Sequence, residues 1–176
     1  MDDESEVAVI NEHRLGVSGD DIQLDSSEEN QTLILELVSQ AAKTIDIFTR
    51  DMASRVYDDA KFIAAARDLI VRNDKTRVRI LIIDPDKSIK HGHRIIELAR
   101  RLSSSIDIRH VHVDYRADSQ SYLIADGRGI LHRKLASRYE AIVNFNNPLW
   151  GRELLNHFNE IWEHSQPILD FKRLHI

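Results

Sequence analysis

The chain has 176 residues, no cysteine and a formal net charge of −5 at pH 7. This length suits one domain with a single core, and the lack of cysteine excludes disulfides, thiol catalysis and cysteine-based zinc sites. The acidic balance argues against nucleic acid as a partner, because Lys and Arg contacts to phosphates supply most non-specific affinity. No apolar run approaches the ~18 residues that cross a bilayer, and the acidic start is unlike a signal peptide. We therefore expect a cytoplasmic protein that does not insert into membranes.

The first elements follow an acidic tail, residues 1–15, that we predict to be disordered, and the remaining residues, 16–176, are predicted to form one domain. Residues 22–24 are expected to form a short strand. The pattern Ser26-x-x-Glu29 is a capping box, and it predicts an amphipathic helix that ends near Lys43. The β-branched and aromatic residues 44–49 predict the next strand.

The middle of the chain alternates between helices and strands. A helix is predicted to begin at Asp58 or Asp59, and the almost continuously apolar segment 78–83 predicts a central strand that Asp84-Pro85 stops. A helix through residues 95–102 and a strand at 106–113 are expected to follow.

The last third is predicted to hold three strands and one helix. The strands are 122–125, 129–133 and 139–145, and the first two are joined by a tight turn at Asp126-Gly127. The final helix, after Asn147-Pro148, is predicted to seal the core because its apolar residues form one stripe. This order predicts an α/β fold: a single domain with a mixed, mostly parallel sheet flanked by helices.

The segment SQSYLIADG, residues 119–127, resembles the His-x-Lys-x4-Asp motif of the phospholipase D superfamily. Ser119 stands at the His position, Ser121 stands at the Lys position, and Asp126 is retained. The capped helix and strand before it, and the strand and Trp-bearing helix after it, are also similar to that superfamily over residues 26–165. The end of the chain is further similar to an uncharacterised bacterial phospholipase D-like domain that accompanies acetyltransferases.

This resemblance implies a phospholipase D-like fold whose motif is degenerate. In active members the His attacks phosphorus, the Lys holds phosphate oxygens and the Asp orients the His. A serine offers neither an imidazole nor a positive charge, so Ser119 and Ser121 cannot do these jobs. We therefore expect a binding, regulatory or assembly module. The alternative is a phosphodiesterase or nuclease-like enzyme with a rearranged site that uses Asp126, His132 and Lys134.

Partners and ligands are predicted as follows. Superfamily members with one motif pair two copies, which implies a homodimer, and the rival is a monomer that docks on another protein. Arg128, His132 and Lys134 are candidates for weak binding of a phosphate-type anion beside Asp126, although Arg133 should face the other side of their strand. No metal site is expected, because His110 and His112 lack a third ligand. No cofactor is expected, because no glycine-rich phosphate loop occurs.

Overall fold

The computed structural model describes residues 13–168. Its strands are β1 (Ile22–Leu24), β2 (Thr44–Thr49), β3 (Arg77–Ile82), β4 (Ile106–His110), β5 (Ser121–Ala125), β6 (Gly129–Arg133), β7 (Ala141–Asn144) and β8 (Gln166–Pro167). Its helices are α1 (Ser27–Gln40), α2 (Ser54–Tyr57), α3 (Ala60–Arg72), α4 (Asp86–Lys90), α5 (Arg94–Arg101) and α6 (Pro148–His164), with a 3-10 turn, η1 (Val113–Tyr115).

The strands form one mixed sheet in the order β1-β7-β6-β5-β2-β3-β4-β8. The predicted α/β class, the single mixed sheet and the flanking helices are confirmed. The expectation that most pairs are parallel is wrong, because only β2–β3 and β3–β4 are parallel and the other pairs are antiparallel. Helical crossovers join the parallel strands, whereas the short connection between β5 and β6 makes that pair antiparallel.

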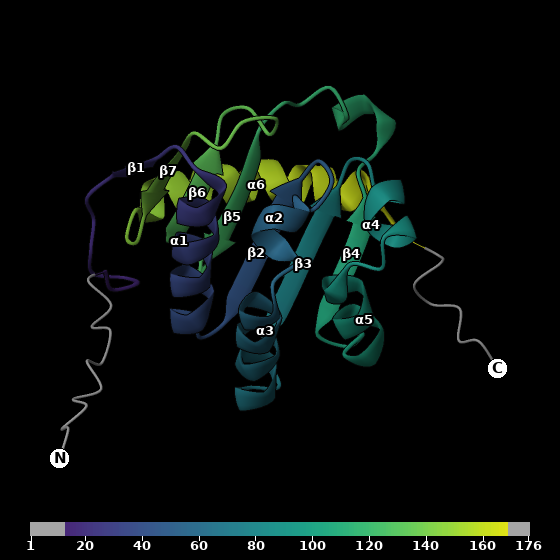
Figure 1. Ribbon diagram of the computed structural model, residues 1–176, viewed down its shortest axis with the longest axis horizontal. Coiled ribbons are helices and arrows are strands. Elements are labelled where there is room, and N and C mark those ends of the chain that lie inside the picture. The colour runs from purple at the N-terminus through teal and green to yellow at the C-terminus, as the bar shows by residue number, and fades with distance from the viewer. Residues whose placement is uncertain (1–12, 169–176) are drawn as a thin grey trace, which may run out of the picture.

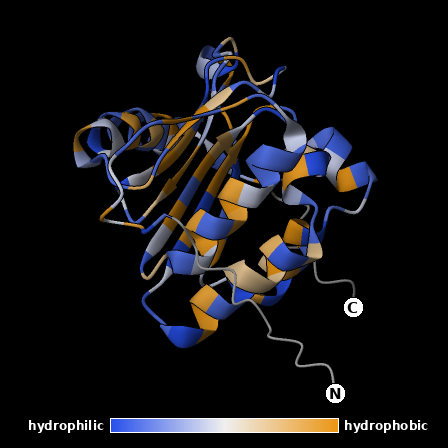
Figure 2. Ribbon diagram, turned by 60° about the vertical axis from the view of Figure 1, so that its left-hand side comes forward, coloured by the Kyte–Doolittle hydropathy of each residue, from blue (hydrophilic) through white to orange (hydrophobic). Residues whose placement is uncertain are grey.

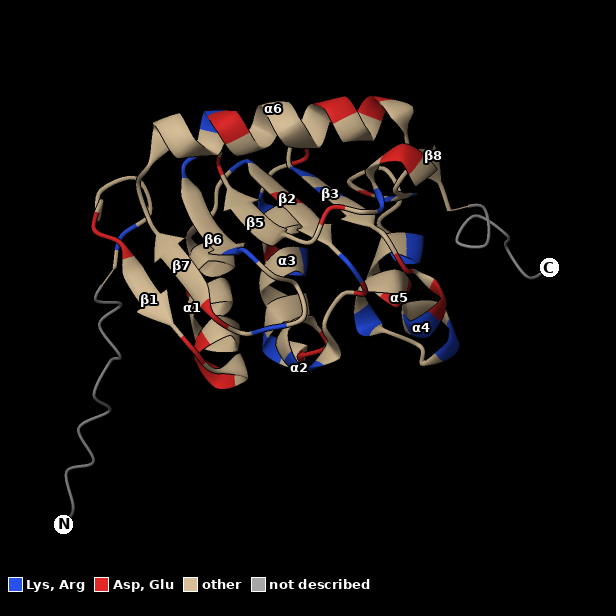
Figure 3. Ribbon diagram, turned by 90° about the horizontal axis from the view of Figure 1, so that it is seen from above, with Lys and Arg blue, Asp and Glu red and all other residues tan. Residues whose placement is uncertain are grey.

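The sheet is covered on both faces (Figure 1). Figure 3 shows α6 along one face, with α1, α3 and α5 on the other. Apolar residues divide into one core cluster beneath α1, α3 and α5 and a second beneath α6. The strands are largely hydrophobic, and the helices alternate between hydrophobic and hydrophilic residues (Figure 2). This two-sided burial explains why strand β3 is mostly apolar, with Arg79 as a polar residue on the face that α6 covers.

The structure adds elements that the sequence pattern did not predict, namely α2, α4, η1 and β8, each of five residues or fewer. Helix α1 ends at Gln40 rather than near Lys43, and β4 ends at His110 rather than at residue 113. The N-cap half of the predicted capping box is confirmed, because the Ser26 hydroxyl accepts a hydrogen bond from the Glu29 amide, whereas the Glu29 carboxylate accepts from the Asp25 amide and not from that of Ser26. No helix in the described part of the chain is long and apolar enough to cross a bilayer.

The predicted tail lies mostly outside the described residues, as does the end of the predicted domain, 169–176. Its last three residues are described and are packed against the domain. The Leu15 amide donates to Gln40, Gln40 donates to the His13 carbonyl, and the His13 ring stacks on Phe145. Residues 13–15, the end of the predicted tail, thus contact the domain.

Candidate functional site

The two serine positions of the motif lie at the end of the sheet where β2 and β6 end and β5 begins. Ser121 is the first residue of β5 and is 1% exposed. Its hydroxyl donates to the Phe48 carbonyl at 3.1 Å and accepts from Nη2 of Arg133 at 3.4 Å. Ser119 is exposed, and its carbonyl accepts from the Ala136 amide at 2.7 Å. Ser121 is therefore held inside the domain, whereas Ser119 is exposed beside it.

Asp126 lies at the opposite end of β5 from these serines. Its carboxylate accepts the amides of Ala42 at 2.8 Å, Lys43 at 2.8 Å and Thr44 at 3.0 Å. Its backbone has φ of 51°, in the left-handed region that the turn requires. At about 3.3 Å per residue, β5 separates Asp126 from Ser121 by roughly 17 Å. The retained acid therefore joins the start of β2 to the β5–β6 turn, and it cannot orient a group at position 119.

The three anion candidates do not meet beside Asp126. Strand register pairs Gly129 with Ala125 and His132 with Tyr122, so His132 and Lys134 lie at the serine end of the sheet. Arg128 lies at the Asp126 end, and its side chain is within 4 Å of the Cβ position of Gly16. This corrects the expectation of a single cleft beside Asp126. The β5–β6 hairpin places Arg128 at one end of the strands and His132 and Lys134 at the other end.

His110 and His112 each serve local structure. Nε2 of His110 is 3.1 Å from the Ile83 carbonyl, and Nδ1 of His112 accepts from the Asp114 amide. Among residues 13–168, no three His, Cys, Asp or Glu side chains gather as a metal site would require.

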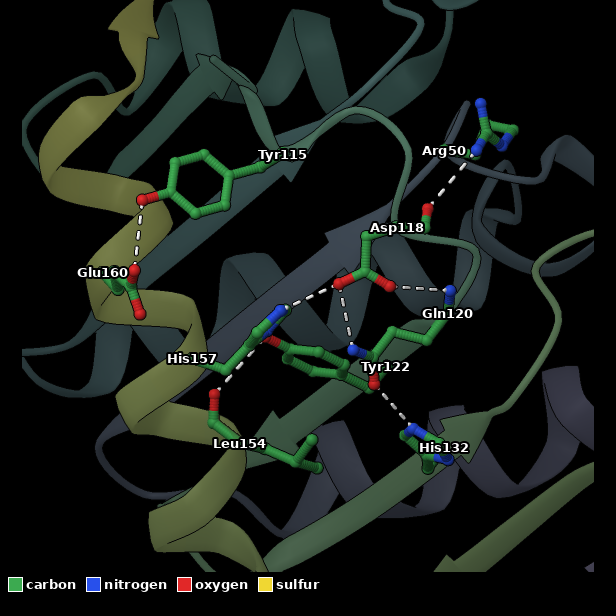
Figure 4. Close-up of polar contacts among 9 residues, drawn as sticks. All are labelled: Arg50, Tyr115, Asp118, Gln120, Tyr122, His132, Leu154, His157 and Glu160. Carbon is green, nitrogen blue, oxygen red and sulfur yellow. Dashed lines mark hydrogen bonds and ion pairs between the residues drawn. The ribbon is translucent and has the colours of Figure 1, made fainter. Parts of the chain in front are cut away.

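A polar network at the serine end was missed by the sequence analysis (Figure 4). Asp118, just before the motif, has Oδ2 at 2.8 Å from Nε2 of His157 and at 3.1 Å from Nε2 of Gln120. Nδ1 of His157 is 2.7 Å from the Tyr122 hydroxyl. Gln120 continues the chain, with Oε1 at 2.9 Å from Nε2 of His132. One carboxylate thus holds two histidines, one of them through an intervening amide.

Hydrogen-bond direction fixes the proton on His132. Burial tends to raise the pKa of Asp118, but hydrogen bonds from His157 and Gln120 outweigh burial, and the net pKa is lowered. The ionised carboxylate accepts from the Gln120 amide nitrogen, so the Gln120 oxygen must accept the Nε2 proton of His132. In the neutral ring Nδ1 then carries a lone pair, to which no described residue donates. Burial lowers the pKa of His132, which favours this neutral form.

A pocket of about 480 Å³ adjoins this network at the ends of β1 and β6 and the start of β7. Its charged lining residues are Asp25, Glu29, Lys134 and Glu140, and His132 lines it as well. Three carboxylates face one lysine, so this pocket is a poor place for an anion.

Acidification is expected to destabilise the protein through His132. Burial is the main cause of its lowered pKa and is partly offset by Asp118. As pH falls, His132 in the unfolded chain therefore binds a proton near the usual pKa of 6.5, whereas in the folded chain it stays neutral to a lower pH. Stability should therefore fall as pH drops through about 6.5. His93, with a pKa also lowered by burial, adds to this loss. Urea melts at about pH 7.5 and 5.5 should show a shallower loss in His132→Gln. Identical losses in both proteins would contradict this role.

The network escaped detection because its members are far apart in sequence. His157 lies on the last helix, 39 residues after Asp118, and its position in the helix repeat looked like that of a surface residue. The available signal was the pair Asp118 and Gln120, which flanks Ser119 at the start of the motif.

Comparison with known proteins agrees with this fold. Residues 26–174 match a family described as "Domain of unknown function (DUF7931)". A search of curated proteins found no significant match. The phospholipase D family member Nuc from Salmonella typhimurium superposes with a TM-score of 0.61 at 16% identity, over 85% of this chain and 99% of that one. NucT from Helicobacter pylori superposes with a TM-score of 0.64 at 10% identity, with the same coverage of 85% and 99%.

TrmBL2, described as an archaeal chromatin protein with a novel mode of DNA binding, superposes with a TM-score of 0.61 at 18% identity. The match covers 94% of this chain and 56% of TrmBL2, so the chain spans about half the length of that protein. At these identities the likenesses concern the fold alone. The predicted phospholipase D-like fold is confirmed.

Proposed function

Because the chain belongs to the family described as "Domain of unknown function (DUF7931)", and because it folds like phospholipase D proteins, we propose that it is a catalytically degenerate domain. In this proposal it acts as a binding, regulatory or assembly module. Its work is to hold a ligand or a second protein rather than to cleave a phosphodiester.

The state of Ser121 is the observation that carries this proposal. Its hydroxyl is buried and already bonded to the Phe48 carbonyl and to Arg133, so it is not available to a substrate. Ser119 is exposed, but among the described residues no imidazole or carboxylate is hydrogen-bonded to its hydroxyl to activate it as a nucleophile. Asp126 is occupied by three amides at the far end of β5. None of the motif positions is thus arranged for phosphoryl transfer.

The purified protein is expected to hydrolyse neither a chromogenic phosphodiester nor phosphatidylcholine vesicles above the rate without protein. The reason is the missing nucleophile and the missing phosphate-binding cation of the motif. His132→Ala and Ser119→Ala should give the same baseline as the wild type. Turnover that is lost in either variant would instead support the alternative, an enzyme with a rearranged site around the Asp118 network.

We also propose a homodimer, on the basis of the resemblance to single-motif superfamily members. A closed dimer uses the same patch on both copies. Light scattering over a dilution series should give a mass near twice the 20.3 kDa of one chain. A mass near 20.3 kDa at tens of micromolar would favour the rival monomer that docks on another protein.

Nucleic-acid binding is the second candidate function, and the likeness to TrmBL2 over 94% of this chain is the observation in its favour. The net charge of −5 opposes it. Titration of a short duplex at low and physiological salt would test nucleic-acid binding, because binding through phosphates weakens steeply with salt.

The cytoplasmic location and the association with an acetyltransferase stay predictions.

A further inference from the structure

Arg133 is a buried guanidinium that has no acidic partner. It ends β6 directly opposite Ser121 and is 3% exposed. None of the ion pairs among the described residues includes it. A guanidinium stays charged at every working pH, and a buried charge is costly unless it is paired. The fold therefore keeps a positive charge where burial opposes one.

The hydrogen bonds of Arg133 are long for a charged donor. Nη2 reaches the Ser121 hydroxyl at 3.4 Å, and Nη1 reaches the carbonyls of Ala136 and Arg138, each at 3.4 Å. Charge-assisted bonds to an anion are usually about 2.7–2.9 Å. The guanidinium is thus held by three neutral oxygens at the outer limit of bonding distance and by the Tyr139 ring, 5.8 Å away at its centroid, and an oxyanion would bind it more closely.

The position of this cation matches what the motif has lost. Ser121 stands where the superfamily has its Lys, and Arg133 lies across the strand pair from it, with its guanidinium against the serine hydroxyl. A positive charge is therefore restored at the Lys position from the neighbouring strand. Burial raises the pKa of nearby Tyr57 to about 12, and the Arg133 charge opposes that rise.

We propose that Arg133 is the anion-binding residue of this domain and that residues 134–139 form a lid over it, displaced when a phosphate-type oxyanion binds. This inference rests on the proposed binding function. The guanidinium would exchange the Ala136 and Arg138 carbonyls for two oxygens of the anion, a geometry that its planar fork favours.

Few hydrogen bonds hold the lid to the rest of the domain, and its last residue, Tyr139, also packs against the core cluster with its ring 5.8 Å from the Arg133 guanidinium. Besides its bonds to Arg133, the Ala136 amide donates to the Ser119 carbonyl, and Asn30 donates to the Tyr139 carbonyl at the end of the segment. Lys134, Ser137 and Arg138 are exposed. Lys134 and Arg138 are the charged residues of this segment, and neither belongs to an ion pair among the described residues. Residues 134, 135, 137 and 138 are exposed, which favours local opening of the segment.

The test compares wild type with Ser121→Asp, which places a carboxylate directly opposite Arg133. Thermal unfolding is followed with inorganic phosphate and with chloride at equal ionic strength. Phosphate should raise the midpoint of the wild type and should not raise that of Ser121→Asp, because the new carboxylate occupies the guanidinium. Ser103→Asp, an exposed change in the turn before β4 at the opposite end of the sheet, is the matched control and should keep the phosphate response.

Direct binding gives a second measurement. Calorimetric titration with phosphate should show affinity about tenfold or more weaker in Arg133→Gln than in wild type. If Arg133→Gln does not fold, Ser121→Asp still decides the matter. Absence of a phosphate response in wild type, or an equal response in wild type and Ser121→Asp, would overturn the proposal and leave Arg133 as a clamp for the loop.

Two further arms identify the anion and the lid. A short single-stranded oligonucleotide replaces free phosphate in one arm, and a larger response to the oligonucleotide than to phosphate would assign the anion to a nucleic-acid backbone. Hydrogen exchange of residues 134–139 should change when phosphate is added, and unchanged exchange would contradict the lid. A hydrolysis assay on the same samples distinguishes the proposed function from the proposed site. Turnover would contradict the degenerate function but would leave phosphate binding at Arg133 standing.

Discussion

Phe158→Ala is expected to lower the free energy of unfolding by about 3–5 kcal/mol, because it removes a large side chain from the middle of a packed core. Phe158 is 0% exposed and lies in the cluster beneath α6. Its ring stacks on Trp162 with centroids 5.6 Å apart, and the Arg79 guanidinium lies 4.8 Å from its centroid. The surrounding strands are fixed by the sheet, so the resulting cavity cannot collapse completely.

Leu149→Ala, on the same helix, is the matched control. Leu149 is 66% exposed, so its loss should cost about 0.5 kcal/mol or less. Urea denaturation of the three proteins gives the comparison. A cost below about 1 kcal/mol for Phe158→Ala would mean that the apolar stripe of α6 does not hold the helix on the sheet.

Arg79→Met is expected to cost about 3–5 kcal/mol at neutral pH, because it leaves a buried carboxylate without its partner. Asp46, on the central strand β2, has a side chain that is 3% exposed, and its Oδ1 is 2.6 Å from Nε of Arg79. Arg79 also donates to Asn159 of α6 at 2.9 Å. The substitution keeps the length and apolar stem of the side chain, so the lost charge is the main change.

The pH dependence of this variant tests the cause. Burial raises the pKa of Asp46 and Arg79 lowers it, so removal of Arg79 should raise it further. A carboxyl with a raised pKa destabilises the fold once it ionises, so the deficit should shrink as pH falls and Asp46 is protonated. The control Arg67→Met breaks a surface pair with Asp68, whose side chains are 59% and 62% exposed, and should cost about 0–1 kcal/mol. Equal deficits in both variants would show that the Asp46 pair carries no special weight.

The sequence by itself determined the longer helices and strands and the family resemblance. Local signals sufficed where the information was local: the Ser26 capping box began α1 and the apolar run of β3 marked an inner strand. The Asp126-Gly127 pair likewise placed the turn between β5 and β6. These features depend on residue propensities and on spacing within a few residues, and both can be read directly from the sequence.

Only the tertiary structure decided the sheet directions and the membership of the site. The register of the β5–β6 pair placed Asp126 at one end of the strands and the serines at the other end, and it brought Arg133 against Ser121. Helix α6 carried His157 to Asp118 across 39 residues. Short elements such as α2 and α4 form because neighbouring packing supports them, since helices this short are not stable by themselves. Contacts between residues far apart in sequence are set by strand pairing and helix docking, so the spacing of residues along the chain does not reveal them.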